Sequence, residues 1–250
     1  MQDLLIYGLF ALVLVAGWVL RSPWLKGTLG EIRVNSSLRS LLDEHEYRLF
    51  KDLTLPTHGG TTQIDHVIVS RFGVFVIETK NMKGWIYGGA DQALWTQVIY
   101  RRKFQFQNPI RQNYKHVKAV QELLGIKAHQ LHSVVVFVGS GVPKTAMPIG
   151  VVWGVRSLAE YIESKRVVVV GENELGSLVE GLSENSLQPG IRTRLTHVRH
   201  VKTQVAKRQN DAAKCPRCGA KLVERTNRQS GERFLGCSRF PRCKGTRKLP

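Results

Sequence analysis

Alternating apolar and polar positions are clearest in the middle of the first half of the chain. Two β-branched runs, Ile64–Val69 and Val74–Thr79, flank a three-residue turn that ends in glycine. Such a pair of runs predicts a β-hairpin. Three polar side chains lie within or beside the runs: Asp65, Glu78 and Lys80. Since side chains alternate between the two faces of a strand, Glu78 and Lys80 share a face, and pairing through the turn brings Asp65 toward them.

The hydropathy pattern predicts further strands and helices on both sides of this hairpin. Helices are expected at 30–45, from 109 to about 125, at 157–165 and at 173–182; strands are expected at 47–55, 84–87, 94–106, 133–139 and 166–170. The last two strands are continuous apolar runs, which is typical of buried central strands. Alternation of this kind predicts an α/β fold, with a mixed central sheet flanked by helices.

The N-terminal stretch is apolar enough to suggest a membrane anchor. Leu4–Leu20 contains seventeen residues without a charge, and Trp18 lies near its end. Arg21 and Lys26 follow it, so the positive-inside rule predicts a single-pass helix in a bacterial-type inner (plasma) membrane, with the N-terminus outside and the main domains cytoplasmic. A cleaved signal peptide and a buried core helix are the alternatives, although no basic leader or small-residue cleavage site is visible.

Basic residues are concentrated at the other end of the chain. The 37 Lys and Arg residues against 19 Asp and Glu give a net charge of +18. Residues 191–250 contain 17 basic and 3 acidic residues, and so carry +14 of that charge. A block of this kind favours a polyanionic partner, either nucleic acid or an anionic membrane surface. A solvated basic tail without a specific partner is the alternative.

All four cysteines lie in this basic segment, in a pattern typical of zinc. Cys215 and Cys218 are spaced C-x2-C, and Cys237 and Cys243 follow as C-x5-C. Two such pairs can provide four thiolates to a tetrahedral Zn2+, and metal binding would drive folding of a unit too small for its own core. A disulfide pairing is disfavoured on the cytoplasmic side of a membrane.

The polar triad of the hairpin favours a divalent cation. Two neighbouring carboxylates repel each other unless a cation lies between them, and Mg2+ or Mn2+ suits oxygen ligands. Asp65 and Glu78 are the candidate ligands, and Lys80 is a candidate to orient or deprotonate an attacking water. No GxxxxGK[ST] loop and no G-x-S-x-G elbow occurs, so the sequence does not indicate an ATPase or an α/β-hydrolase.

The D-x12-E-x-K pattern resembles the PD-(D/E)XK nucleases, and the words GEIRVNSSL and QIDHVIVSRFGVFVIETKNMKGWIYG resemble the NERD (nuclease-related) domain. The resemblance implies a restriction-endonuclease-like fold and a catalytic set of Asp65, Glu78 and Lys80. It also implies that Glu31 reaches toward the metal and that Gln112 faces the cleft. For Glu31, a role at the helix dipole is an equal alternative, and for Gln112 so is a solvated helix face. Ile64 stands where the superfamily name implies proline.

The cysteine segment, with CPRCG and GERFLGCSRFPRC, resembles the four-cysteine zinc ribbon of type IA DNA topoisomerases. That family binds single-stranded DNA, which implies stacking and phosphate contacts by Phe234, Phe240, Arg233 and Arg239; a purely structural zinc site is the alternative. In the nuclease-like domain, basic residues interleaved with aromatics make Arg101 and Arg102 further candidates for nucleic-acid contact, or for an ordinary charged strand edge.

These inferences together predict a membrane-anchored, metal-dependent DNA nuclease. The expected parts are an anchor at 1–26, a NERD nuclease-like domain at 27–186, a basic linker at 187–213 and a zinc ribbon at 214–250. The alternative is a membrane tether that binds nucleic acid without cutting it. Three histidines, His45, His58 and His116, are scattered between the motifs and are assigned no role; His66 is expected on the strand face opposite Asp65.

Overall fold

The computed structural model describes residues 23–57, 60–186, 203, 213–227 and 231–249. The predicted anchor at Leu4–Leu20 lies outside these residues, as does almost all of the predicted linker. Within the described part of the chain, no helix is both long enough and apolar enough to cross a membrane.

A five-stranded sheet of order β1-β2-β3-β7-β9 forms the centre of the larger domain. Its strands are β1 (Arg48–Thr57), β2 (Gly60–Ser70), β3 (Gly73–Asn81), β7 (Leu131–Val138) and β9 (Val151–Trp153). Strands β1, β2 and β3 run antiparallel, whereas β3, β7 and β9 run parallel. The sheet is therefore mixed, as the sequence predicts, and the hairpin predicted around residue 72 is β2–β3.

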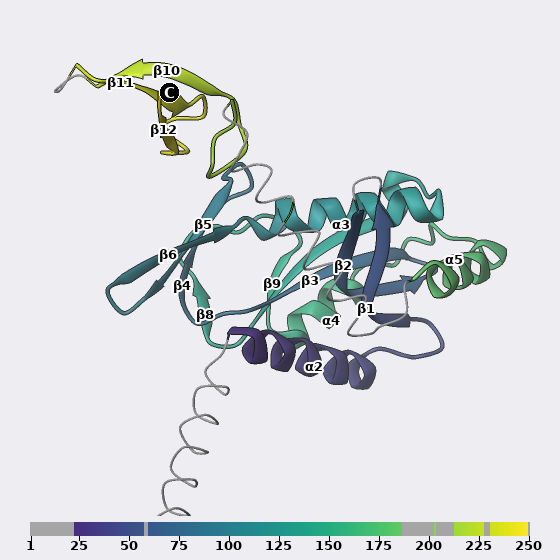
Figure 1. The fold of residues 1–250 in the computed structure, drawn as a ribbon. Coiled ribbons are helices and arrows are strands. Elements are labelled where there is room, and N and C mark those ends of the chain that lie inside the picture. Colours follow the sequence, from purple (N-terminus) through teal and green to yellow (C-terminus); the bar gives the residue numbers. More distant parts are fainter. Residues whose placement is uncertain (1–22, 58–59, 187–202, 204–212, 228–230, 250) are drawn as a thin grey trace, which may run out of the picture.

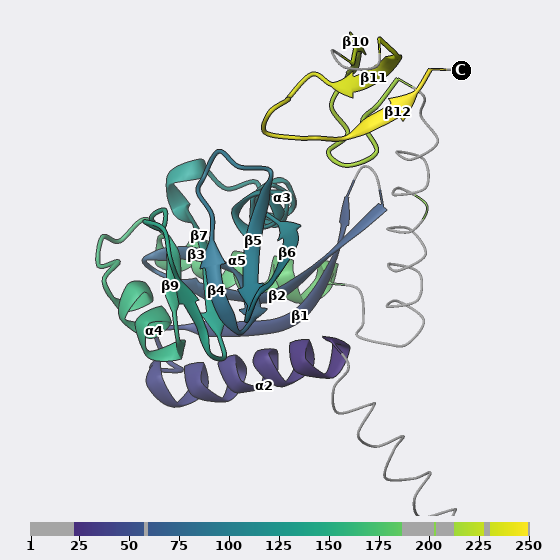
Figure 2. The same cartoon turned by 90° about the vertical axis from the view of Figure 1, so that its left-hand side faces the viewer.

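Helices cover both faces of this sheet (Figures 1 and 2). On one face lie α2 (Pro23–Leu41) and α4 (Val155–Glu163), and on the other lie α3 (Pro109–Leu124) and α5 (Glu172–Asn185). The alternation along β3 separates two cores: Phe75 and Ile77 pack toward α2 and α4, while Val74 and Val76 pack toward α3 and α5. By the same alternation, the side chains of positions 78 and 80 point to the α3 side.

The turn between β2 and β3 explains the glycine at its end. Phe72 donates its backbone N–H to Ser70 Oγ at 3.1 Å, and Gly73 has a φ of 122°. A Cβ at Gly73 would lie 2.7 Å from the carbonyl oxygen of Gln130, in the short 3-10 helix Ala128–Gln130. Any other residue would therefore be strained and would push this helix away from the hairpin.

A second sheet, of order β6-β5-β4-β8, packs at one end of the central sheet. It contains β4 (Gly84–Tyr87), β5 (Leu94–Ile99), β6 (Arg102–Gln107) and β8 (Gly141–Pro143). The single strand predicted at 94–106 is wrong, because the chain reverses at Tyr100, which has a φ of 54°, and forms the β5–β6 hairpin. Fully buried Trp95 stacks on Phe137 of the central sheet and joins the two sheets.

Two other predictions differ from the structure. The run at 166–170 is not a strand: Val167 and Val168 are exposed, and the backbone N–H groups of Val169 and Val170 both donate to the carbonyl of Arg71 at the hairpin turn. The first helix spans Pro23–Leu41 and not 30–45, and its residues Ile32 and Leu41 are exposed. The buried row is instead Val34, Leu38 and Leu42, at a regular spacing of four.

The C-terminal unit is a small antiparallel sheet of β10 (Leu222–Thr226), β11 (Arg233–Cys237) and β12 (Thr246–Lys248). Its core is little more than the four cysteines and Leu222. In both views, it lies on the side of the molecule opposite α2 (Figures 1 and 2).

Candidate functional site

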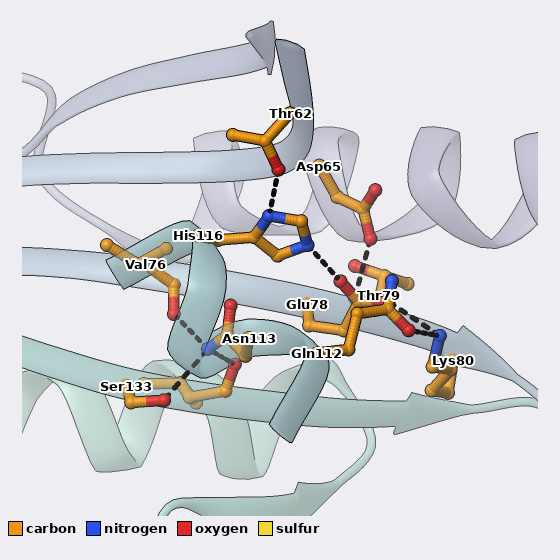
Figure 3. A network of polar contacts seen from close by, with 11 residues as sticks. Thr62, Asp65, Val76, Glu78, Thr79, Lys80, Gln112, Asn113, His116 and Ser133 are labelled. Atoms are coloured by element: carbon orange, nitrogen blue, oxygen red, sulfur yellow. Dashed lines mark hydrogen bonds and ion pairs between the residues drawn. The ribbon is translucent and has the colours of Figure 1, made fainter. Parts of the chain in front are cut away.

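Asp65 and Glu78 face each other where β2 separates from β3. The ladder pairs His66 with Ile77 and ends there, so that Asp65 and Glu78 hold the next opposing positions. The backbone N–H of Thr79 donates to Asp65 Oδ2 at 2.7 Å (Figure 3). Strand β3 continues alone beside β7 as far as Asn81. The Asp65 carboxylate thus accepts the hydrogen bond of the Thr79 N–H at the point where the pairing of β2 with β3 stops.

Glu78 is the most tightly held member of the site. Its side chain is buried, with 3% of the residue exposed. Oε1 accepts a hydrogen bond from Lys80 Nζ at 2.6 Å, and Oε2 lies 3.2 Å from His116 Nε2, which is an ion-pair distance without hydrogen-bond alignment. Lys80 Nζ also donates to Gln112 Oε1 at 3.0 Å. Four side chains from β3 and α3 therefore form one network (Figure 3).

His116 belongs to this network, so the expectation that it has no role is wrong. The ring is buried, and Nδ1 lies 2.8 Å from Thr62 Oγ1 on β2. A contact chain thus runs from Thr62 through His116 to Glu78 (Figure 3). The sequence does contain a signal for it: Gln112 and His116 are four residues apart and so share one face of α3.

The helix that carries these two side chains is fixed by two asparagines. Asn108 caps its N-terminus by accepting from the backbone N–H of Ile110 at 2.9 Å, and proline follows at the first helical position. Asn113 is fully buried, and its Nδ2 donates to the carbonyls of Val76 and Val134 at 2.8 and 3.1 Å. These bonds fix the rotation of α3 over β3 and β7, so that Gln112 and His116 face the carboxylates.

The two carboxylates differ in their electrostatic surroundings. Burial, together with the negative charge of Glu78, raises the pKa of Asp65 well above its usual range. Burial would also raise the pKa of Glu78, but the contacts with His116 and Lys80 outweigh it and the pKa of Glu78 is lowered. Among the described residues, Asp65 has no comparable cationic partner, and an added cation would therefore favour its ionised form most.

Glu31 and His66 both lie on the α2 side of this pair. Glu31 is half-buried on α2, and its charge is near enough to contribute to the raised pKa of Asp65. His66 is buried in contact with the backbone of Glu31, and burial lowers its pKa to about 4. His66 thus packs on the α2 side of the sheet, away from Glu78, and stays neutral.

The oxygen-rich composition of the site fits a hard divalent cation. Asp65, Glu78 and Glu31 are the candidate donors. In the arrangement described, both oxygens of Glu78 already have partners, and among the described residues only the four cysteines form a group of three or more potential ligands within 4.8 Å of one another. A metal ion bound here would therefore share the Glu78 carboxylate with Lys80 and His116.

Arg101 and Arg102 are not part of this site. Arg101 lies in the turn of the β5–β6 hairpin, and Arg102 begins β6 opposite Ile99. Both are exposed. The structure thus brings together Asp65, Glu78, Lys80, Glu31 and Gln112 among the residues predicted for the nuclease-like domain, and leaves these two arginines at a separate hairpin tip.

The four cysteines form a compact sulfur cluster. Cys215 Sγ lies 3.8 Å from Cys243 Sγ, and Cys218 Sγ lies 3.4 Å from Cys237 Sγ. A tetrahedral zinc with Zn–S bonds of about 2.3 Å places its sulfurs roughly 3.8 Å apart, so the spacing fits. Gly245 leaves room for the cluster, since a Cβ there would lie 2.3 Å from Cys215 Sγ. Because burial raises the pKa of the Cys243 thiol to about 12, a metal ion is what would keep it as a thiolate.

One surface of this unit combines aromatic and basic side chains around a hollow of about 540 Å3. The guanidinium of Arg225 lies over the ring of Phe240, 5.3 Å from its centroid, and Phe234 lines the same hollow. Arg233 is bound to Glu224 across the β10–β11 pair. Arg239 projects on another side, toward α3. Of the four predicted DNA-contacting residues, the two aromatics therefore share one surface, and the two arginines do not join them.

Two family models match separate parts of the chain. Residues 26–138 match the family model of the nuclease-related domain (NERD), and residues 212–250 match that of the topoisomerase DNA binding C4 zinc finger. The first matched range runs from α2 to the end of β7, and the second contains the C-terminal unit with its four cysteines.

Similar proteins cover only parts of the chain. An uncharacterized protein of Bacillus anthracis is 50% identical over 103 residues, which are 41% of this chain and 48% of that protein. DNA topoisomerase 1 of Pyrococcus horikoshii is 50% identical over 30 residues, 12% of this chain and 4% of that enzyme. The chain thus spans about half of the first relative and a small part of the second.

One solved structure, SfsA of Pyrococcus furiosus in complex with Ca2+, covers 65% of this chain and 53% of that one. Its sequence identity is 14% and its TM-score 0.23. A likeness this weak has no bearing on the function.

Proposed function

We propose that this protein is a metal-dependent DNA nuclease, in which the nuclease-related domain hydrolyses phosphodiester bonds and the zinc ribbon holds the DNA. The observation that carries the proposal is the acidic pair of buried Glu78 and partly buried Asp65, opposite each other at the end of the β2–β3 ladder with Lys80 bound to Glu78. Two neighbouring carboxylates withdrawn from water in this way are costly to maintain without a compensating role.

The chain's own groups have distinct parts in this chemistry. Asp65 and Glu78 would hold a divalent cation, Mg2+ or Mn2+, with help from Glu31; when bound, the cation neutralises negative charge on the phosphate. Lys80 positions the attacking water. Gln112 holds the Lys80 ammonium at 3.0 Å, and His116 holds Glu78 from the opposite side, so both act by positioning.

The decisive measurement is cleavage of labelled single-stranded, duplex and branched DNA by the full chain with Mg2+ or Mn2+. We expect Lys80→Ala and Glu78→Gln to lose at least about 100-fold in rate, which is typical for groups that handle a proton or a metal in the reaction. Lys83→Ala is the matched control, because Lys83 is exposed just beyond β3 and lies outside the network. Undiminished cleavage by Lys80→Ala and Glu78→Gln would contradict the assignment of this site.

A second candidate is DNA binding without cleavage, supported by the closed pairing around Glu78. Both Glu78 oxygens are already occupied by Lys80 and His116, as in a purely structural network. This candidate predicts salt-dependent DNA binding with no turnover in any divalent metal. In either case, the apolar stretch Leu4–Leu20 is proposed to tether the chain to the inner membrane, with the main domains in the cytoplasm.

A further inference from the structure

The zinc ribbon and α3 enclose a cleft between the two domains, hereafter the basic cleft. Its volume is about 560 Å3. One wall is the first cysteine knuckle, from Lys214 to Gly219, together with Arg239; the other is α3 and the base of the β5–β6 hairpin. Arg217 crosses between the walls and donates to Gln105 Oε1 at 3.1 Å. In both views, the ribbon lies over this part of the larger domain (Figures 1 and 2).

The lining of the basic cleft has one sign of charge. None of its lining residues is acidic. Five of its side chains are basic and exposed: Arg111, Lys115, Lys214, Arg217 and Arg239. A zinc ion held by four thiolates adds a charge of −2 at its border, so the cleft still remains positive. Like charges gathered around a hollow repel one another and attract an anion.

The geometry of α3 connects this cleft to the nuclease-like site. Arg111 and Lys115 are four residues apart and form one row on the helix. Gln112 and His116 form the adjacent row, about 100° around the helix axis, and contact Lys80 and Glu78. An anionic chain lying along the first row therefore passes next to the catalytic candidates.

We infer that the basic cleft is the track for one DNA strand, whose phosphates are bound jointly by the ribbon and by α3. This rests on the proposed function, since it supplies the route by which DNA reaches Glu78 and Lys80. The strand is single because a cleft of this volume accommodates a segment the size of a small ligand.

The test is the binding of a fluorescent 20-nucleotide oligothymidine to the full chain over a series of salt concentrations, without divalent metal. Three double variants are compared: the helix-side pair Arg111→Gln/Lys115→Gln, the ribbon-side pair Arg217→Gln/Arg239→Gln, and the control pair Lys118→Gln/Arg242→Gln. The control removes the same charge from α3 and from the ribbon, because Lys118 and Arg242 are exposed and do not line the cleft. Zinc content and circular dichroism check folding.

The plot of the logarithm of the association constant against the logarithm of the salt concentration has a negative slope. Each of the two cleft double variants should reduce the magnitude of this slope by about 1.4 and weaken binding roughly tenfold, since each phosphate contact to a single strand contributes about 0.7. The control pair should change the slope by less than half as much. In oligothymidine that contains 4-thiothymidine, crosslinks should form both to α3 and to the cysteine knuckle of the same protein.

The results that overturn the inference are specific. If the helix-side pair behaves as the control while the ribbon-side pair weakens binding, the ribbon alone holds DNA and the joint track is wrong, although the proposed function stands. Crosslinks confined to α3, or confined to the cysteine knuckle, would likewise show that the two domains do not bind one strand jointly. If the unmodified chain binds no DNA at low salt, both fail. Tighter binding of oligouridine, with the same dependence on the cleft, replaces DNA by RNA as the partner and also contradicts the inference.

Discussion

Glu78 is held in a fixed position by a chain of side chains that begins on another strand. Thr62 contacts His116 at 2.8 Å, and His116 lies 3.2 Å from Glu78, in a region from which water is largely excluded. The contact with Thr62 gives His116 Nδ1 a hydrogen-bond partner in the buried site, and the contact with Glu78 brings the ring within ion-pair distance of a buried carboxylate. His116 therefore stabilises the fold as well as the site.

Replacing His116 by leucine should lower the free energy of unfolding by about 1–3 kcal/mol, because Thr62 and Glu78 both lose a buried polar partner. Urea unfolding followed by circular dichroism measures this. His45→Leu is the matched control, since His45 is exposed, and should change the stability by less than about 0.5 kcal/mol. Equal stability of the two variants would show that the contact chain contributes nothing.

His132 gives the larger domain a sensitivity to acid. Its ring stacks on Phe75 with centroids 4.6 Å apart, and Nε2 lies 3.0 Å from the carbonyl of Phe72. Burial lowers the pKa of His132. Below the ordinary histidine pKa of about 6.5, the unfolded chain therefore binds a proton that the folded chain does not, and stability falls as the pH falls.

The corresponding prediction is a comparison of urea unfolding at pH 7.5 and pH 5. We expect His132→Phe to keep the ring stacking, to lose some stability at pH 7.5 with the hydrogen bond, and to lose less than the unmodified protein on acidification. An unchanged pH dependence in this variant would remove His132 as a source of the acid sensitivity.

At the level of residues, the sequence identifies the charged members of the site but not their neutral partners. Asp65, Glu78 and Lys80 interrupt apolar strands, and a charge in such a run is conspicuous. His116 is conspicuous only in relation to Gln112 four positions earlier, and only if that face of α3 is known to cover β3. Which face of a helix is buried depends on the packing of distant segments, and so it is not visible locally.

The position of α3 over the sheet depends on one buried amide. Asn113 Nδ2 donates to the carbonyls of Val76 and Val134 on two neighbouring strands, and it also contacts Ser133 Oγ at 3.0 Å. Because this helix carries Gln112 and His116 on one row and the basic cleft residues on the next, both sites depend on its rotation.

Asn113→Leu should therefore be among the more damaging single changes in the domain. It leaves buried strand carbonyls without a donor and should lower the free energy of unfolding by about 2–4 kcal/mol. The control is Asn185→Leu at the exposed end of α5, where the side chain bonds only Gly181 of its own helix. If both variants unfold at the same urea concentration, Asn113 does not anchor α3.

At the level of elements, local pattern identifies the β2–β3 hairpin because strands, turn and glycine agree with one another. It fails at 94–106, where the alternation runs through the reversal at Tyr100 without a glycine or proline to mark it. It fails again at 166–170, where β-branched residues have strand propensity but bond to the turn at Arg71 and to the side chain of Gln130, and no described strand pairs with them.

For the whole molecule, the two domains differ in what holds them together. The larger domain has two extensive apolar cores, one on each face of its sheet. The ribbon has a core of four cysteines and Leu222, too small to be stable without a metal.

Removal of zinc with a strong chelator should therefore unfold the ribbon and leave the larger domain folded. Limited proteolysis should then cut within 214–248, while a fragment of about 27–186 persists. The zinc content, expected to be one ion per chain before chelation, should fall in parallel with the appearance of these cuts. Cys218→Ser should give the same pattern without a chelator. A ribbon that resists proteolysis after complete loss of zinc would contradict a structural role for the metal.

Because β2 separates from β3 at Asp65, this side chain also has a structural role: its carboxylate bonds the backbone of β3 and so joins two diverging strands. An asparagine at this position retains an oxygen for the Thr79 N–H and removes only the charge. A chain with Asp65→Asn should consequently keep its fold while losing affinity for a cation. Asp65→Ala also removes the hydrogen bond to Thr79, so a loss of cation binding in that variant could come from a change in the fold. The asparagine variant therefore tests the role of the charge separately from the role of the hydrogen bond.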